Sequence, residues 1–438
     1  MGELREVPLV ELRPVRAWHP NRGADPSALI CPVYDTLSEE ELERYGHRPH
    51  NASQFVPRPR SLSVGEFTAR AAARLSVALA SGDYVQDPEP AFYVYGIRYV
   101  PPPDILETIP TGERRREYLL LGLVGALDLA DRAGREVAMH ERTFDDRVEE
   151  RVALTRATGM SFAPIMAGYH LPDHAFNDRL ESLLGIDRRG LAFHARVPSL
   201  VEAGLEGTTH YLWRVDDARA VAELRERVRR LRALVLDGHH RFTAARRSAE
   251  RGTPVRPLAM LVDGRDRALR VLPWHRVLPA SVASPERVLT AARKVFPSTA
   301  AVRPLDSSAD AVERLHEWHR SGSRGFLIVH GGEVREAQTP PSADVGADFD
   351  RLHEFLEGEL GLDPHDLLFV RSPSAALARI ATPGDPGSGG TAFLLPPLHE
   401  PGIEARAFGT GAMMAHKSTM FLPKVAEGVV FAPATDGT

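Results

Sequence analysis

The chain has 438 residues and a formal net charge of −5, and hydrophobic and charged residues make up 43% and 26% of it. These proportions are typical of a globular protein, which excludes a disordered or a membrane-spanning class, and the length predicts about two or three packed units. Because acidic residues outnumber basic ones, nucleic acid is disfavoured as a partner.

The longest apolar run, Tyr118–Leu127, is much shorter than the roughly 20 residues that span a bilayer, and Asp128 ends it. Charged residues interrupt the N-terminus, so we expect neither a membrane span nor a secretory signal. The single cysteine, Cys31, cannot form an internal disulfide and is expected to be a small buried residue. These features predict a cytoplasmic protein that does not contact membranes.

The first predicted unit, residues 1–112, is an α/β unit. It contains an amphipathic helix over 67–79 and a strand over 91–100 that alternates apolar side chains. A proline-rich stretch, 101–112, indicates its boundary.

The second predicted unit, residues 113–280, alternates strands and helices, and Gly252 is a typical stop signal for its last helix. The third, residues 281–438, is again α/β, so the expected fold class is mixed α/β with three units. The expected strands are 119–129, 163–169, 234–236, 258–262, 326–329 and 392–395, and the expected helices are 144–157, 218–231, 241–251 and 285–295.

A strand-to-helix turn carries the first candidate site, Asp237-Gly238-His239-His240-Arg241. Gly238 permits close backbone approach, and the free N–H groups at the start of the following helix attract an anion. Arg241 can bind a phosphate, both histidines can donate hydrogen bonds, and Asp237 can hold a divalent metal or orient a histidine. From the spacing alone, a capped turn with surface histidines is as probable as a phosphate site.

Lysines mark a second segment, because only three of the 54 basic residues are lysines and both Lys417 and Lys424 lie there. A lysine in such an arginine-rich chain indicates a place where a compact ammonium is needed. Lys417, Ser418 and Thr419 are therefore expected to bind phosphate or carboxylate. The segment is no standard phosphate loop, since His416 stands where the required glycine would be. A surface turn before a buried strand is the alternative.

The third segment is His140-Glu141-Arg142-Thr143, directly before the predicted helix 144–157. A carboxylate at the end of an extended segment can serve as the general base for a hydroxyl. Thr143 is also a good N-cap, so ordinary helix-start chemistry is the alternative.

In the fourth segment, Ser38 and Glu41 have the spacing of a capping box. The box leaves Tyr34 and Asp35, on the preceding turn, available to face a pocket.

Together these segments resemble, in order and over nearly the whole chain, the signatures of a bacterial and archaeal family known as domain of unknown function 1015. Its Asp-Gly-His-His-Arg part is similar to free L-serine kinases. The resemblance implies a ParB and sulfiredoxin-like nucleotide-binding core at residues 113–280, flanked by N-terminal and C-terminal α/β units. Val33 and Ala415 stand where the family has prolines, which alters loop geometry but leaves the polar groups intact.

The implied reaction transfers a phosphoryl group from ATP or ADP, with Mg²⁺, to the hydroxyl of a free amino acid. L-serine is the implied acceptor and O-phosphoserine the product. The implied catalytic residues are Glu141, Asp237 and His239; the nucleotide or phosphate contacts are Gly238, His240, Arg241, Lys417, Ser418 and Thr419; the substrate contacts are Tyr34, Asp35, His140 and Thr143; and Asp237 is the metal ligand.

Two other functions stay open at this point. A nucleotide-binding switch related to ParB would close around DNA or a protein and use no small acceptor, although the negative charge and the lack of a helix-turn-helix count against DNA. A thiol-redox enzyme would need Cys31 as nucleophile, and ranks last. The expected partners are a nucleotide and a small hydroxylated substrate, and a homodimer is left open.

Overall fold

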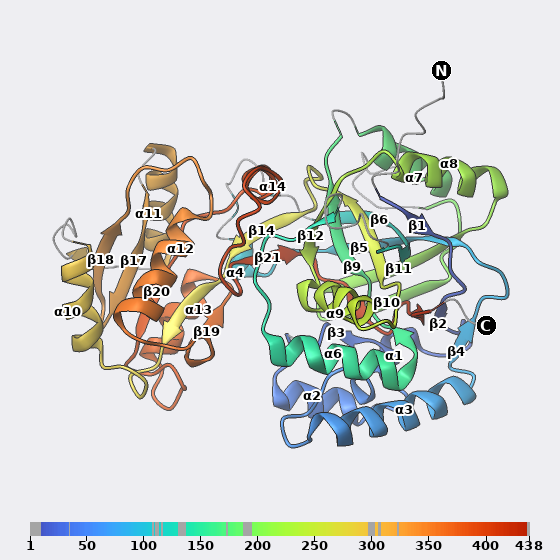
Figure 1. The fold of residues 1–438 in the computed structure, drawn as a ribbon, viewed down its shortest axis with the longest axis horizontal. Helices are drawn as coiled ribbons and strands as arrows, with labels where there is room; N and C mark the ends of the chain where they lie inside the picture. Colours follow the sequence, from blue (N-terminus) through green and yellow to red (C-terminus); the bar gives the residue numbers. More distant parts are fainter. Residues whose placement is uncertain are drawn as a thin grey trace.

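The computed structural model describes residues 10–34, 36–106, 109, 114, 117–129, 137–171, 174–186, 195–296, 303–304, 308–321 and 324–435. Asp35 and residues 107, 108 and 110–112 of the expected boundary lie outside these ranges. Figure 1 shows a larger body and a smaller body, the latter coloured yellow to orange, with α14 (Glu400–Gly409) between them. No helix in the described residues is long and apolar enough to cross a membrane.

The main sheet of the larger body has the strand order β10-β11-β5-β6-β13-β9-β12-β7, and β1 also pairs with β6. It mixes parallel pairs, such as β13 with β9, and antiparallel pairs, such as β12 with β9, so the expected mixed α/β class is confirmed. Its strands are β1 (Leu12–Arg13), β5 (Phe92–Tyr99), β6 (Tyr118–Leu127), β7 (Val137–Ala138), β9 (Ile165–Tyr169), β10 (Val201–Leu205), β11 (Thr208–Val215), β12 (Ala233–Asp237) and β13 (Leu258–Asp263).

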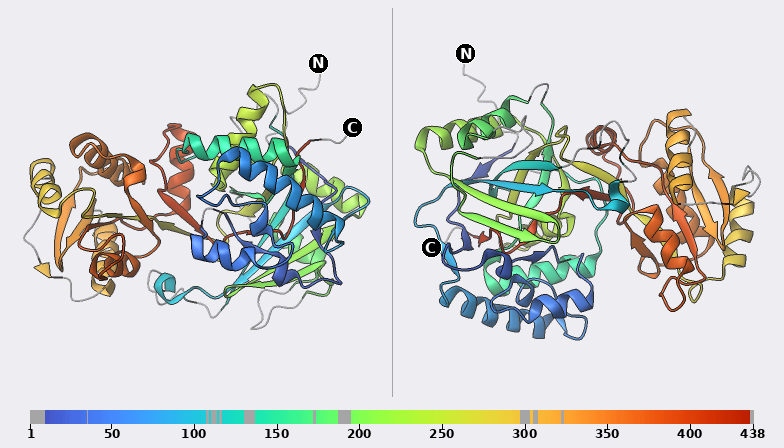
Figure 2. Two further views of the ribbon diagram at one scale, coloured as in Figure 1. Left: turned by 90° about the horizontal axis from the view of Figure 1, so that it is seen from below. Right: turned by 180° about the vertical axis from the view of Figure 1, so that it is seen from behind.

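Helices cover both faces of this sheet (Figure 2). The helices of the larger body are α1 (Pro26–Leu29), α2 (Glu39–Gly46), α3 (Val64–Ala80), α4 (Pro103–Leu106), α6 (Asp145–Thr158), α7 (Ala175–Leu184), α8 (Ala218–Val228) and α9 (His239–Glu250), with a 3₁₀ turn, η1 (Ala52–Gln54). Two-stranded pairs join β2 (Trp18–Pro20) to β4 (Tyr84–Gln86), β3 (Cys31–Pro32) to β22 (Ala426–Glu427), and β8 (Met160–Ser161) to β23 (Ala432–Pro433).

The smaller body has a sheet with the order β16-β18-β17-β20-β15-β19. Its strands are β15 (His275–Leu278), β16 (Arg303–Pro304), β17 (Gly325–His330), β18 (Glu333–Gln338), β19 (Leu368–Val370) and β20 (Thr391–Leu394). Its helical segments are α10 (Pro285–Val295), α11 (Ser308–Ser321), α12 (Ala347–His353), the π-helical η3 (Glu354–Glu359), the 3₁₀ turn η4 (Pro364–Asp366) and α13 (Pro373–Ala381). The chain leaves the larger body through β14 (Arg270–Pro273) and returns through β21 (Thr419–Leu422), which pair antiparallel.

The buried strand β5 explains why the sheet is covered on both sides. Tyr93, Tyr95 and Tyr99 belong to one core cluster, whereas Phe92 and Val94 belong to the other. A strand that buries both faces needs a layer on each, and α7 and α8 supply one of them. Because β5 pairs with β6 along its length, one sheet spans the expected boundary at residue 112.

Helix α9 begins earlier than the sequence predicted. The expected start was Arg241, but Gly238 has φ +90° and is the N-cap, so His239 and His240 lie in the first turn. The expected capping box at the start of α2 is confirmed, with Ser38 as N-cap and Glu41 returning the bond.

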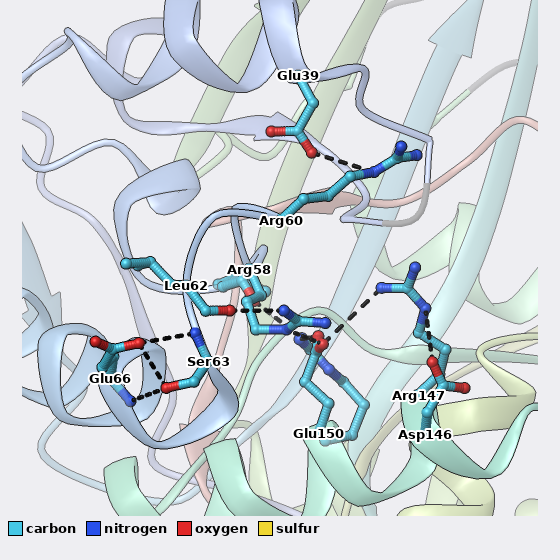
Figure 3. A network of polar contacts seen from close by, with 11 residues as sticks. Glu39, Arg58, Arg60, Leu62, Ser63, Glu66, Asp146, Arg147 and Glu150 are labelled. Carbon is cyan, nitrogen blue, oxygen red and sulfur yellow. Dashed lines mark hydrogen bonds and ion pairs between the residues drawn. The ribbon is translucent and has the colours of Figure 1, made fainter.

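Polar contacts attach the segment before α3 to α6 (Figure 3). Arg58 Nε donates to Glu150 Oε2 at 2.5 Å, and its Nη1 donates to the carbonyl of Leu62 at 2.7 Å. Ser63 and Glu66 form the capping box that starts α3. The layer of α2 and α3 is thereby fixed to α6.

Close packing of β1 on β6 predicts intolerance at Gly125. A Cβ there would lie 2.7 Å from the carbonyl oxygen of Arg13, a backbone atom that cannot rotate away. We expect Gly125→Ala to destabilise the larger body by about 1–3 kcal/mol. Gly65→Ala in α3 meets nothing within 4 Å and should stabilise it slightly. Calorimetric unfolding midpoints measure both, and equal shifts would contradict the packing.

Candidate functional site

A recess lies where the end of β12, the start of α9 and the segment around β21 meet, on the side of the larger body nearest β14 (Figure 1). It brings together parts of all four sequence segments. The lining residues are Tyr34, Thr36, Glu141, Leu236, Asp237, Gly238, His239, His240, Arg241, Trp274, Lys417, Thr419 and Lys424.

The start of α9 forms one wall. Gly238 is its N-cap and no side chain caps the helix there, and the positive end of the helix dipole at such a start favours an anion. A Cβ on residue 238 would lie 3.0 Å from Nε and Nη2 of Arg241. A glycine at this position therefore allows the positive φ of the turn and leaves room for the Arg241 side chain to pass close to the backbone.

Two cations hold the buried carboxylate of Asp237. Lys424 Nζ contacts Oδ1, and Arg241 Nη2 donates to Oδ2 at 3.2 Å. Arg241 is itself fixed by the carbonyls of Ala163 and Pro164, at 2.5 and 3.1 Å from its Nη1. Lys424 was not predicted as a site residue, although its rarity gave the same signal that selected Lys417.

Glu141 joins the third and second segments. Its Oε1 accepts the N–H of Lys417 at 2.9 Å, and its Oε2 accepts the N–H and hydroxyl of Thr419 at 3.1 and 2.9 Å. Beside it, the N–H of Met414 donates to the carbonyl of His140 at 2.7 Å. The carboxylate thus fixes the turn that carries Lys417.

A chain of polar groups runs behind the recess. His239 Nε2 lies 3.3 Å from His140 Nδ1, and His140 Nε2 lies 2.8 Å from Thr419 Oγ1. The two imidazoles and the Thr419 hydroxyl thus form one chain of polar contacts, and His140 also has a hydrogen bond with the backbone of Val235. Burial, opposed by Asp237, lowers the pKa of His239 to about 3, and burial together with His239 lowers the pKa of His140 to about 3. Both imidazoles are neutral at physiological pH.

Two further predicted residues face the recess in supporting positions. His240 Nε2 accepts the N–H of Phe144 at 3.1 Å, and the two rings are parallel. Tyr34 stacks under Arg151, whose Cζ lies 4.2 Å from the ring centroid.

Other predicted residues lie elsewhere. Thr143 is not among the lining residues, and it is not the N-cap either, because Phe144 occupies that position without a side-chain cap. Ser418 is fully buried and donates its hydroxyl to the carbonyl of Ala415 at 2.9 Å, so it supports the turn from behind. Asp35 lies outside the described residues.

Trp274, between β14 and β15, and Arg276, in β15, are groups that no local sequence signal indicated. The ammonium of Lys417 lies 5.6 Å from the ring centroid of Trp274. Arg276 is fully buried and donates to the carbonyl of His416 at 3.2 Å, and burial, opposed by Glu141, lowers its pKa to about 9. Single tryptophan and arginine residues carry no motif, so only the strand pairing reveals their place.

The arrangement does not fit a metal ion held by Asp237. Both of its oxygens are engaged by cations. In the described part of the chain, no group of three or more His, Cys, Asp or Glu side chains is placed to hold a metal. Asp237 here orients two cations.

The thiol-redox alternative finds no support in the position of Cys31. The side chain is fully buried in the described structure, and burial raises the pKa of its thiol well above the usual value. A protonated, buried thiol is a poor nucleophile. The expectation of a small buried residue is confirmed.

The neutral histidines predict acid sensitivity. Since the folded pKa of about 3 for His140 and His239 lies below the ordinary 6.5, the unfolded chain binds protons first as the pH falls. Stability is therefore full above pH 6.5 and falls toward pH 3, by up to about 1.4 kcal/mol per pH unit for each histidine. Urea unfolding at several pH values between 7 and 5 gives the free energy of unfolding as a function of pH. This free energy should fall less steeply with decreasing pH in His239→Asn than in the native protein, and the exposed His47→Asn is the control. An unchanged pH dependence in His239→Asn would refute the assignment.

Comparison with known proteins gives a family but no described activity. No curated protein matches the chain. Solved structures with similar architecture include a free serine kinase mutant in complex with ADP, with 12% identity, 66% of this chain and 84% of that chain covered, and a TM-score of 0.36. A conserved hypothetical protein from Pyrococcus furiosus has 12% identity, covers 66% and 87%, and has a TM-score of 0.35. The profile described as protein of unknown function DUF1015 matches residues 12–353, and the chain belongs to this family.

Proposed function

We propose that this protein transfers a phosphoryl group from ATP or ADP to the hydroxyl of a free amino acid, with L-serine as the first candidate. One observation carries the proposal: Arg241, Lys417 and Lys424 converge with the uncapped start of α9 on one recess. Phosphoryl transfer requires positioning and charge neutralisation more than covalent help, and this recess supplies both. The acceptor class comes from the resemblance of residues 237–241 to free serine kinases.

Asp237 prepares the cations for a phosphate. By contacting Lys424 through one oxygen and Arg241 through the other, it holds both charges in place before a ligand arrives. Preorganised charges cost little reorganisation at the moment of reaction. Because the recess does not fit a protein-held metal, these side chains provide the neutralisation that the protein itself contributes.

Glu141 combines two tasks in this proposal. A carboxylate can accept about four hydrogen bonds, and three are used, with only one of them on Oε1. Oε1 therefore retains capacity to accept the proton of a substrate hydroxyl. The same carboxylate stabilises Lys417 at φ +53°, a conformation that costs a non-glycine residue about 1 kcal/mol or more.

The neutral histidines complete the recess. His239 lines the recess and can position a ligand through a hydrogen bond without adding charge, and His140 supports His239 from behind. His240 is tied to the N–H of Phe144 and fixes the start of α6 against α9. These contacts give the second and third segments a common frame.

Phosphorus NMR tests the function directly. Protein, magnesium and ATP or ADP are incubated with a panel of hydroxy amino acids. A new phosphomonoester supports the kinase. Free phosphate alone would support the alternative, a ParB-like nucleotide switch without a small acceptor, and unchanged nucleotide with every acceptor would refute the phosphotransferase.

Loss of the Glu141 carboxylate should affect turnover and the turn. Glu141→Gln removes the base, and the amide nitrogen faces backbone N–H donors, so we expect turnover to fall by about 10²–10⁴ and the unfolding temperature to drop. Rates of phosphomonoester formation and calorimetric unfolding measure the two effects. The exposed Glu202→Gln is the matched control, and full turnover in Glu141→Gln would remove this residue from the mechanism.

The rare lysines offer a matched pair of variants. Lys424→Met deletes a cation at Asp237 and should weaken ATP or ADP binding by roughly tenfold or more, as expected for a charge-assisted hydrogen bond. Lys294→Met removes an exposed lysine from α10 in the smaller body. Isothermal titration calorimetry compares them. Equal nucleotide affinity in both variants would show that Lys424 does not contact the phosphates.

A further inference from the structure

A second cavity lies between α6 and α9, on the other side of Arg241 from the recess. It shares Tyr34 and Arg241 with the recess and is also lined by Arg151 and Glu427. Its volume is about 40 Å³, whereas one water needs roughly 10–15 Å³. It therefore suits a small polar head group and excludes a nucleobase with its ribose.

Glu427 brings an incompletely satisfied carboxylate to this cavity. The side chain is fully buried, its Oε2 accepts the N–H of Ala163 at 3.2 Å, and the carboxylate also interacts with the backbone of Tyr34 and with the charges of Arg151 and Arg241. Its Oε1 has no direct hydrogen-bond partner among the described residues. A buried carboxylate oxygen without a donor is costly, and such atoms in native proteins usually have a ligand or water. An ammonium group would satisfy it.

Two guanidinium groups border the same space. Arg151 and Arg241 are largely buried, and the Nε of each has no hydrogen-bond partner among the described residues. Glu150 contacts Arg151, but its single negative charge is shared with two other arginines, Arg58 at 2.5 Å and Arg147 at 3.9 Å (Figure 3). Cationic side chains thus outnumber carboxylates here, so an anionic group is also accommodated.

We propose that this cavity binds the zwitterionic head of the acceptor amino acid, with its ammonium on Glu427 and its carboxylate on Arg151 and Arg241. This inference rests on the proposed function and assigns the acceptor subsite. A simple anion would meet Glu427 and a simple cation would meet the guanidinium groups, so among charged ligands one with both charges matches these three side chains best. Because Tyr34 and Arg241 line both spaces, the proposed head-group subsite adjoins the phosphate site.

Calorimetry with three probes tests the subsite in the ADP-bound protein. L-serine should bind, whereas glycerate, which lacks the ammonium, and ethanolamine, which lacks the carboxylate, should bind at least tenfold more weakly. Glu427→Gln should weaken L-serine by roughly tenfold or more and reduce the preference for serine over glycerate, while ADP affinity stays within about twofold. Equal binding of serine and glycerate to the native protein would overturn the proposal.

Two further variants separate a lost subsite from a lost fold. Asp348→Asn alters another fully buried acid, in the smaller body, and should leave serine binding unchanged. Arg151→Gln should weaken serine and reduce its preference over ethanolamine, which provides an independent result if Glu427→Gln unfolds. Native serine affinity in either folded cavity variant would refute the subsite.

The outcomes also distinguish this inference from the proposed function. Serine binding that depends on Glu427, without any phosphomonoester in the NMR assay, would refute the kinase and retain the subsite. Phosphoserine formation whose KM for serine is unaffected by Glu427→Gln would retain the kinase and refute the subsite.

Discussion

The carboxylate of Glu141 joins two parts of the chain that are 276 positions apart, and the candidate site depends on that junction. Buried carboxylates require donors, and here the backbone of the 417–419 turn supplies them. The smaller body is contained in the intervening chain and leaves and returns through the paired strands β14 and β21. The pairing closes the insertion, and Glu141 fixes its returning end at the recess.

Charge compensation at Asp237 determines what the recess can bind. A carboxylate between an ammonium and a guanidinium leaves a net positive environment, and the start of α9 adds its partial positive charge. The same two contacts make Asp237 a partner of cationic side chains, whereas the sequence also suggested it as a metal ligand. One motif in the sequence is compatible with either role, and only the partners across space decide between them.

Local signals allowed part of this structure to be predicted. The capping box at Ser38, the strand β5 and the glycine turn at residue 238 each depend on residues close in sequence, and each was found. The start of α9 was misplaced because Gly238 acts as the N-cap without a side-chain partner, a geometry that leaves no polar residue pattern. Thr143 was a wrong N-cap prediction. Threonine is often found at N-caps, but here the N-cap is Phe144 and the helix begins one residue later than expected.

The residues that the sequence did not reveal are those whose role depends on partners far along the chain. Lys424 gains meaning from Asp237, Arg276 from the carbonyl of His416, and Glu427 from the cavity beside Arg241. Arg241 shows why such contacts matter, because one guanidinium borders both the recess and the cavity while the carbonyls of Ala163 and Pro164 hold it fixed. A ligand group on either side therefore meets the same immobile charge. This shared boundary, more than any single motif, makes the two spaces neighbours.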